Sequence, residues 1–169
     1  SSHRIERAMS MAECKQAVLV EKETAHRDCL TGCYDRMTIR HLVDLCFLKS
    51  DVRQSHAMFV IDVDNFKDYN DKYGHANGDL CLKHFAAAMK KCFPKDSILG
   101  RYGGDEFVVY IKNATSDDAH RYMGEFQREI SHLMMSGGEH VTVSASAGGV
   151  AFIGEGEDFV SLCRSADNM

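Results

Sequence analysis

The stretch SILGRYGGDEFVVYIK at residues 97–112 decides the fold, because its pattern predicts a β-hairpin. Two segments rich in β-branched and aromatic residues flank the pair Gly103-Gly104, and adjacent glycines supply the positive φ angles that tight hairpin turns need. The acidic pair Asp105-Glu106 follows at once, although adjacent carboxylates repel each other. The rest of the sequence has to explain why the two pairs stand side by side.

Helical and strand patterns alternate on both sides of this hairpin. Residues 57–61 form a short, continuous apolar run that ends at Asp62, which is typical of a buried strand. Residues 64–79 form a polar loop interrupted by Gly74 and Gly78. The sequence predicts helices at 1–27, 35–49, 80–93 and 116–135, strands at 57–62, 97–102, 107–112 and 141–153, and a last helix that begins at Asp158.

From residue 57 onward this order matches the split β-α-β pattern of a ferredoxin-like fold. We therefore predict an α+β fold, ferredoxin-like, whose central, mainly antiparallel sheet is flanked by helices packed on one face. In this topology the end of the strand at 57–62 lies beside the hairpin tip. Asp62 is then expected to meet Asp105 and Glu106 at one edge of the sheet.

Three carboxylates at one edge repel strongly unless a cation lies between them. Magnesium takes one or two protein carboxylates together with substrate phosphates, and paired metal ions are used for displacement at phosphorus. The alternative is a solvated acidic turn and an unrelated Asp at a strand end, and each of these features, taken alone, is more often structural than functional. Taken together in this topology, they predict a metal site.

The polar loop carries a second group of candidate residues. Asn65-Phe-Lys67 is predicted to lie at a helix N-terminus, where backbone N–H groups bind phosphate and Lys67 adds positive charge. Asn70 and Asp79 combine an amide with a carboxylate, which suits the donor and acceptor pattern of a guanine edge. The alternative is that both are turn formers or caps, with Asp79 as the N-cap of the helix at 80–93.

Composition excludes several classes of function. The formal net charge of the 169 residues is -5, which argues against nucleic acid as a partner. The seven cysteines form no Cys-x-x-Cys pair, so we expect neither a zinc site nor a disulfide framework, but reduced thiols in the cytoplasm. No apolar run reaches the roughly 18 residues of a membrane span, although a segment upstream of this sequence is free to anchor a longer protein in the membrane.

Residues 1–27 are predicted to form a helical region separate from a domain at 28–169. Their apolar residues recur at an imperfect heptad-like spacing, so a coiled-coil connector and a solvated helix both remain open. The chain begins Ser-Ser-His without an initiator Met. We therefore expect a longer protein with an upstream sensory or regulatory domain.

From about residue 28 to its end, the chain resembles the GGDEF family of diguanylate cyclases, which have a fold like the palm of nucleotidyl cyclases. The resemblance rests on several motifs in a fixed order rather than on one glycine pattern. They are Asp28-Cys-Leu-Thr-Gly32, Phe59-Val-Ile-Asp-Val-Asp-Asn-Phe-Lys67, Asn70-Asp71, Tyr73-Gly-His75, Gly78-Asp79, Gly103-Gly104-Asp105-Glu106-Phe107 and Ser144-Ala-Ser-Ala-Gly-Gly-Val150.

The resemblance implies a reaction and a set of residues for it. Such domains condense two GTP molecules into cyclic di-GMP and two pyrophosphates across a homodimer, in which each 3′-hydroxyl attacks the α-phosphate of the other GTP. Two Mg²⁺ or Mn²⁺ ions per site are then held by Asp62, the Val63 carbonyl, Asp105 and Glu106. The catalytic residues are Asp105, Glu106 and Lys67, and the substrate-binding residues are Phe66, Lys67, Asn70, His75, Asp79, Gly103 and Gly104. Because Asp79 is a carboxylate, GTP is expected over ATP.

Two departures from the family pattern stand out. Pro94 and Ser97 occupy the positions of the Arg and Asp of the family's inhibitory product site, so we expect that site to be absent. The chain also stops at Met169, within the last helix and before the Lys and Arg that usually contact the terminal phosphates. The alternative function is a catalytically silent module that binds GTP or cyclic di-GMP, although such modules usually lose the glycines or acids that this hairpin retains.

Overall fold

The computed structural model describes residues 25–49, 54–133, 143–153 and 163–165. The predicted helix at 1–27 therefore lies outside the described residues except for 25–27, which are not helical. Of the predicted last helix, only residues 163–165 are described, and these are helical.

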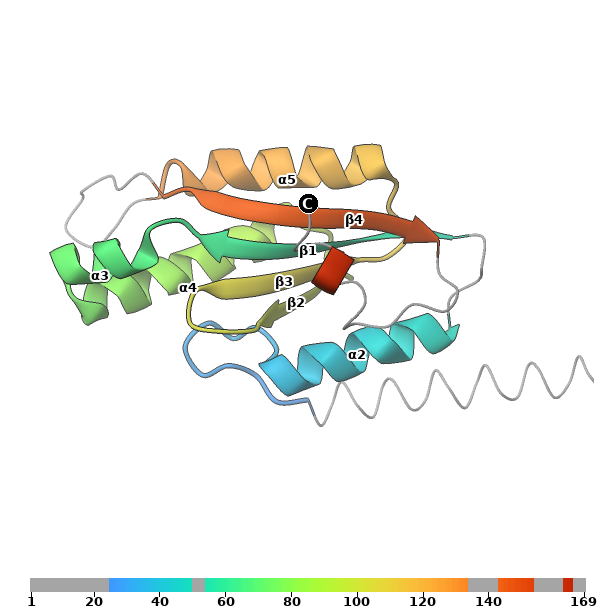
Figure 1. The fold of residues 1–169 in the computed structure, drawn as a ribbon, viewed down its shortest axis with the longest axis horizontal. Helices are drawn as coiled ribbons and strands as arrows, with labels where there is room; N and C mark the ends of the chain where they lie inside the picture. Colours follow the sequence, from blue (N-terminus) through green and yellow to red (C-terminus); the bar gives the residue numbers. More distant parts are fainter. Residues whose placement is uncertain (1–24, 50–53, 134–142, 154–162, 166–169) are drawn as a thin grey trace, which may run out of the picture.

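Figure 1 shows the described helices and strands along the chain. In chain order they are α2 (Arg36–Lys49), β1 (Ser55–Val63), α3 (Phe66–Tyr73), α4 (His75–Cys92), β2 (Ile98–Arg101), β3 (Glu106–Ile111), α5 (Ser116–Ile130) and β4 (Ala145–Ile153). The predicted helix at 116–135 ends earlier than expected, since residues 131–133 are no longer helical.

The four strands form one sheet in the order β2-β3-β1-β4, and every neighbouring pair is antiparallel. β1 and β2 run in the same direction with β3 between them, which is the arrangement of a split β-α-β unit. The prediction of an α+β fold with a mainly antiparallel central sheet is confirmed. As expected, β1 is a central strand whose end lies beside the start of β3.

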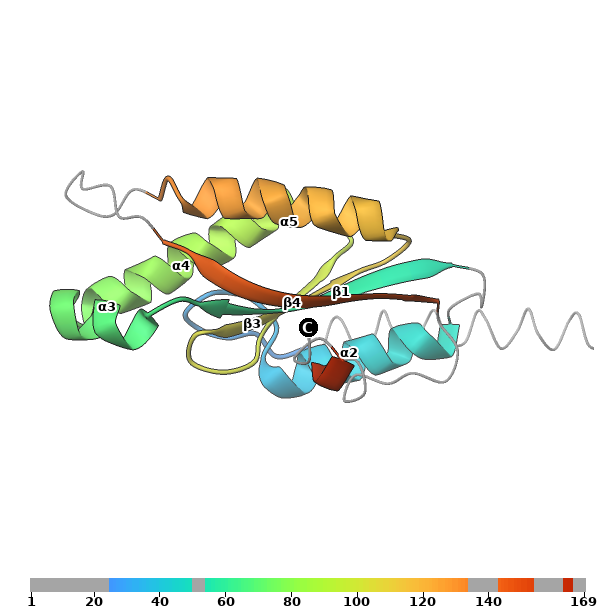
Figure 2. The same cartoon turned by 45° about the horizontal axis from the view of Figure 1, so that its top comes forward.

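Helices cover both faces of the sheet, so the expectation that they pack on one face is wrong. Figure 2 shows α4 and α5 on one side and α2 on the other. The side chains of β1 alternate between the two: Ile61 and Val63 join the core under α4 and α5, whereas Met58 and Val60 join a second core with α2. A strand buried on both faces needs apolar residues at successive positions. This requirement explains the continuous apolar run in β1.

The polar loop predicted at 64–79 folds into helix α3 and the start of α4. Gly74, with φ 86°, separates the two helices, in a backbone region that favours glycine. Gly78 instead lies buried inside α4, where an added Cβ would fall 1.7 Å from the Asn70 Oδ1 atom of α3. Asp79 lies inside α4 as well, so its alternative role as an N-cap is wrong.

The chain reverses between β2 and β3 as predicted, but for a different reason. Among the described residues, positive φ angles occur at Gly32, Gly74, Asn65 and Asn113, and not at the two glycines of the turn. The backbone N–H groups of Tyr102 and Gly103 instead both donate to the Glu106 carbonyl, at 2.8 and 3.3 Å. The turn is a broad one closed by hydrogen bonds.

None of the cysteines in the described part of the chain forms a disulfide bond. Cys33 and Cys81 are buried in the core, and burial raises the pKa of the Cys81 thiol to about 11. These thiols act as small apolar residues. None of the helices that the structure describes is long and apolar enough to cross a lipid bilayer.

We predict that Gly100→Ala destabilises the fold. A Cβ at Gly100 would lie 2.6 Å from the Ile39 Cβ of α2, so β2 and α2 would have to move apart. Overpacking of this kind costs about 1–3 kcal/mol, which urea unfolding measures directly.

Gly124→Ala in α5 is the matched control. Its Cβ meets only the end of the Arg128 side chain, at 3.7 Å, and alanine stabilises a helix interior by up to about 1 kcal/mol relative to glycine. Equal effects of the two substitutions would contradict the packing of α2 on β2.

Candidate active site

The candidate site lies at the end of the sheet where β1 ends and β3 begins. We call this end, with Asp62, Asp105 and Glu106, the carboxylate edge. Asp62 and Glu106 are directly paired across the two strands, and the Val63 N–H donates to the Asp105 carbonyl at 3.1 Å. Directly paired residues point to the same face of an antiparallel sheet. By the alternation of β1 and β3, the Asp62 and Glu106 side chains share the face that α2 covers farther along the sheet.

The arrangement fits a divalent cation, although it does not enclose one. Among the residues that the structure describes, no three His, Cys, Asp or Glu side chains gather closely enough to hold a metal ion. Magnesium, however, is bound by one or two carboxylates together with substrate phosphates rather than by a complete protein cage. Asp62 and Glu106, with Asp105 and the Val63 carbonyl beside them, supply the hard oxygen donors of such a site.

Arg101 holds the turn and was not among the predicted site residues. Its guanidinium donates to the Gly104 carbonyl at 2.8 Å and to the Gly103 carbonyl at 3.3 Å. The same guanidinium donates to both carboxylate oxygens of Asp28, at 3.1 and 3.2 Å. Both side chains are about four-fifths buried, with 19% and 21% exposed. The arginine therefore joins the turn to the start of the domain.

Asp28 is itself held in place by Thr31, whose backbone N–H and hydroxyl donate to it at 2.8 and 2.7 Å. Partial burial alone would raise the pKa of the Asp28 carboxyl. The hydrogen bonds from Thr31 and the positive charge of Arg101 outweigh burial and hold this pKa below its ordinary value. The signal in the sequence was the Asp-x-x-Thr spacing, which places the threonine hydroxyl three residues after the carboxylate.

The two glycines of the turn face open space. A Cβ at Gly104 would meet no atom within 4 Å, and one at Gly103 would meet only Glu106, at 3.7 Å. Neither glycine has a positive φ angle. Neither backbone conformation nor packing within the described chain therefore requires a glycine at these positions.

Helices α3 and α4 place the other predicted residues at the same end of the sheet as the turn, as Figures 1 and 2 both show. Phe66 and Lys67 form the first turn of α3, as predicted for a helix N-terminus. His75 begins α4 and is exposed. Asn70 packs against Gly78, which places it next to the exposed Asp79.

Asn70 carries an unsatisfied acceptor. Its side-chain oxygen is buried and has no hydrogen-bond partner within the described part of the molecule. A buried acceptor without a partner is costly and is seldom tolerated unless a ligand or water satisfies it. This oxygen faces Gly78 of α4, whereas the amide nitrogen of the same side chain is the group that can donate to an acceptor of a guanine edge.

Asp64 is a further residue that the sequence analysis did not single out. Its carboxylate accepts hydrogen bonds from the hydroxyls of Ser144 and Ser146, which belong to the chain that leads into β4 and to β4 itself. Its backbone N–H donates to the Ser144 carbonyl at 2.9 Å. Because the partners lie 80 and 82 residues away, no local pattern indicates this contact.

Pro94 and Ser97 lie in the turn before β2, at the opposite end of that strand from the glycines. The Ser97 N–H donates to the Pro94 carbonyl at 2.9 Å, and the Ser97 hydroxyl oxygen is buried. A buried serine hydroxyl cannot replace an exposed carboxylate as a ligand-binding group. The expected absence of the inhibitory product site stays a prediction.

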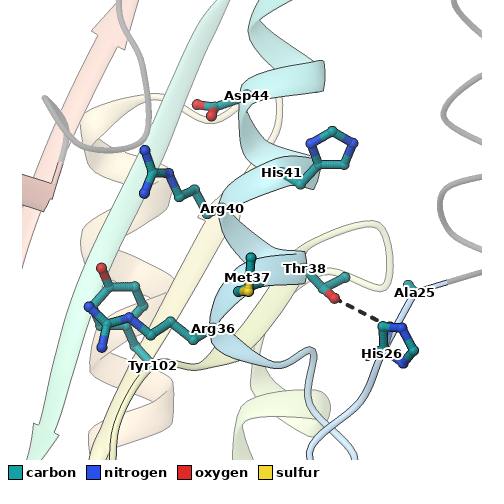
Figure 3. A pocket seen from close by; sticks show the side chains of 9 residues that line it. All are labelled: Ala25, His26, Arg36, Met37, Thr38, Arg40, His41, Asp44 and Tyr102. Carbon is teal, nitrogen blue, oxygen red and sulfur yellow. Dashed lines mark hydrogen bonds between the residues drawn. The ribbon is translucent and has the colours of Figure 1, made fainter.

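A hollow of about 580 Å³ lies on the outer side of α2 and contains none of the predicted site residues (Figure 3). Its lining includes Arg36 and Arg40 of α2 together with Tyr102, and the Arg36 guanidinium lies 4.4 Å from the centre of the Tyr102 ring. Tyr102 directly precedes Gly103 and is the link between this hollow and the turn.

We expect Asp28 and Arg101 to be energetically coupled. A double-mutant cycle with Asp28→Asn and Arg101→Gln should give a coupling of about 0.5–3 kcal/mol in urea unfolding near pH 7. Because folding lowers the pKa of Asp28, this contribution is present above the ordinary Asp range and is lost as the pH falls through the lowered value.

The pair Lys91–Glu129, at 2.7 Å, is the control, because its side chains are 68% and 37% exposed and should show little coupling. A coupling at Asp28 and Arg101 no larger than that of this control would contradict the role of Arg101 in the turn.

Comparison with known proteins supports one family. The model of the family described as "Diguanylate cyclase, GGDEF domain" matches residues 25–169. Diguanylate cyclase DgcM of Escherichia coli is 29% identical over 148 residues, which cover 87% of this chain and 35% of DgcM. Cyclic di-GMP phosphodiesterase PdeR of Escherichia coli is 30% identical over 143 residues, which cover 85% of this chain and 22% of PdeR. The chain thus spans about a third or less of these two relatives.

A solved structure agrees with the sequence comparison. The GGDEF domain of DgcB from Caulobacter crescentus, determined in complex with c-di-GMP, superposes with a TM-score of 0.76 at 25% identity. The match covers 84% of this chain and 85% of that domain. The family model matches every residue that the structure describes, and the carboxylates, the glycines and α3 lie at one end of the sheet. This chain therefore belongs to the GGDEF-domain family of diguanylate cyclases.

Proposed function

We propose that this domain is an active diguanylate cyclase that condenses two GTP molecules into cyclic di-GMP. The observation that carries the proposal is the pair Gly103 and Gly104, where the chain itself requires no glycine beside two carboxylates. Since the fold does not require glycine at these positions, the absence of side chains there leaves room for a ligand to approach the backbone. The adjacent Asp105 and Glu106 suit a ligand that carries phosphates and metal ions.

Each part of a GTP molecule has a partner in the site. The first turn of α3, with Phe66 and Lys67, offers backbone N–H groups and a positive charge to the phosphates. The carboxylate of Asp79 accepts from the N–H groups of guanine, and the amide of the neighbouring Asn70 donates to an acceptor on the same edge of the base. Two Mg²⁺ or Mn²⁺ ions, held by Asp62, the Val63 carbonyl, Asp105 and Glu106, would polarise the α-phosphate when bound.

The reaction consists of two equivalent steps. In each step the 3′-oxygen of one GTP forms a bond to the α-phosphorus of the other, the bond between the α- and β-phosphates breaks, and pyrophosphate leaves. A carboxylate of Asp105 or Glu106 accepts the proton of the attacking hydroxyl. Because each domain holds one GTP, two copies of the domain have to face each other as a homodimer.

The context of the domain is part of the proposal. Because the chain spans about a third of DgcM, a longer protein with an upstream sensory or regulatory domain is proposed here too. We also propose a cytoplasmic location for the domain, which the absence of disulfide bonds among the described cysteines and the substrate GTP support.

A second candidate function is a catalytically silent module that binds GTP or cyclic di-GMP. The relative PdeR favours it, since a protein named as a phosphodiesterase contains a matching region at 30% identity. The retained carboxylates and glycines of the hairpin favour the cyclase instead.

Incubation of the 169-residue chain with GTP and Mg²⁺ at several protein concentrations tests the proposal, with the nucleotide products separated by chromatography. We expect cyclic di-GMP to form at a rate that rises faster than linearly with protein concentration, because the reacting unit is a dimer. Asp105→Ala should abolish the product, because it removes a carboxylate next to the reacting groups.

Asp96→Ala is the matched control, since Asp96 is an exposed acid in the turn before β2. Binding of GTP without any product, at all protein concentrations and with a dimerising fusion added, would favour the silent module.

The substitution Gly104→Ala tests whether this glycine is required for binding the nucleotide or for the stability of the fold. The new Cβ enters open space, so the unfolding free energy in urea should stay within about 0.5 kcal/mol of the parent value. The rate of cyclic di-GMP formation should fall at least tenfold, because the methyl group occupies space that the nucleotide needs.

A Gly104→Ala variant that loses stability and activity together would show that the glycine serves the turn itself. Unchanged activity would show that the nucleotide does not approach this part of the backbone.

A further inference from the structure

Asp64 joins three parts of the domain that are far apart in the sequence. It lies between the end of β1 at Val63 and Asn65, the residue that caps α3. Its two carboxylate oxygens accept hydrogen bonds from the hydroxyls of Ser144 and Ser146. Its backbone N–H extends the pairing of β1 with β4 by one further hydrogen bond, at 2.9 Å to Ser144. We name this group, Asp64 with Ser144 and Ser146, the serine clamp.

The residue after Asp64 is under conformational constraint. Asn65 has φ 54° and ψ 32°, which is the left-handed region, and its side chain makes no capping hydrogen bond to α3. Asparagine adopts this region more readily than most other non-glycine residues, and contacts on both sides of Asn65 hold it there. On one side these contacts are those of the serine clamp, and on the other the Asn65 carbonyl accepts from the Tyr69 N–H of α3 at 3.0 Å.

The serine clamp therefore sets the direction in which α3 leaves the sheet. Asp62 and Asp64 are two residues apart, so the same short segment fixes the carboxylate edge at one end and the first turn of α3 at the other. Without the clamp, β1 would still pair with β3, because that pairing depends on backbone hydrogen bonds and apolar burial. Only the path from Val63 to Phe66 would gain freedom.

We infer that Asp64 is a positioning residue, which holds the first turn of α3 against the carboxylate edge so that the phosphates of the nucleotide are bound. This inference rests on the proposed function of the site. The inference predicts different effects on the two parts of the bound nucleotide. The phosphates depend on the clamp. The base, bound near Asn70 and Asp79, depends on it less, because Asn70 is also packed against Gly78 of α4 and Asp79 belongs to α4.

Two other roles for Asp64 predict different results. If Asp64 were a metal ligand, the serines would matter little, because the carboxylate remains when their hydroxyls are removed. If the clamp only stabilised the fold, its loss would weaken binding of every nucleotide to the same degree. The serine substitutions and the comparison of two nucleotides therefore decide between the three roles.

The test compares the 169-residue chain with the double variant Ser144→Ala and Ser146→Ala, and with the control Ser131→Ala. Ser131 donates its hydroxyl hydrogen bond to the Arg128 carbonyl at the end of α5, so its substitution also removes a serine hydrogen bond. Calorimetric titration in Mg²⁺ measures the Kd of 3′-deoxy-GTP, which lacks the attacking hydroxyl and does not react, and the Kd of GMP. Urea unfolding identifies variants that are still folded.

We expect the double serine variant to bind 3′-deoxy-GTP about tenfold more weakly, while its Kd for GMP changes less than about threefold, a difference well beyond the usual effect of a surface substitution. Asp64→Asn should behave similarly, because an amide accepts from only one of the two hydroxyls. Ser131→Ala should leave both Kd values unchanged.

Equal weakening of both nucleotides would overturn the inference in favour of a purely structural role. Unchanged binding in the serine variants together with a loss in Asp64→Asn would overturn it in favour of a metal ligand. If the parent chain formed cyclic di-GMP and the serine variants bound both nucleotides normally, the clamp alone would be refuted. If the parent chain bound neither nucleotide, the proposed function would fail and the inference with it.

Discussion

The pairing of β1 with β3 in one register is the constraint on which the rest of the domain depends. It sets Asp62 opposite Glu106, and it sends alternate β1 side chains into two different cores. Because side chains alternate with a period of two, a slip by one residue would exchange the two cores and turn the carboxylates to the wrong face. Burial on both faces makes such a slip costly, so the hydrophobic core fixes the position of the polar edge.

The turn at this edge is shaped by polar contacts from another part of the chain. Arg101 binds the carbonyls of Gly103 and Gly104, and Asp28, from the start of the domain, binds Arg101. An arginine fork held by a carboxylate keeps a broad turn open without backbone strain. The two glycines are then available for a ligand, because the turn needs neither their positive φ angles nor their small size.

The candidate site consequently has three parts with three separate supports. The carboxylate edge depends on strand register, the turn depends on Arg101, and the first turn of α3 depends on Asp64 and its serines. Arg101 and Asp64 do not bind the nucleotide themselves, but they contact or adjoin residues that we assign to nucleotide binding. Such residues change the geometry of a site without touching the reacting atoms, and they are difficult to identify from a motif.

By itself the sequence determined the element types, the α+β class and the meeting of Asp62 with the acidic pair, because periodicity, glycine pairs and the order of elements are local signals. The second helical layer, the extent of the helix at Phe66–Tyr73 and the absence of positive φ angles at the turn glycines were decided only by the tertiary structure. The contacts of Arg101 with Asp28, and of Asp64 with the serines of the β4 region, join residues 73 to 82 positions apart. Distant hydrogen bonds leave no periodic trace in a sequence, since their partners are brought together only when the apolar layers pack.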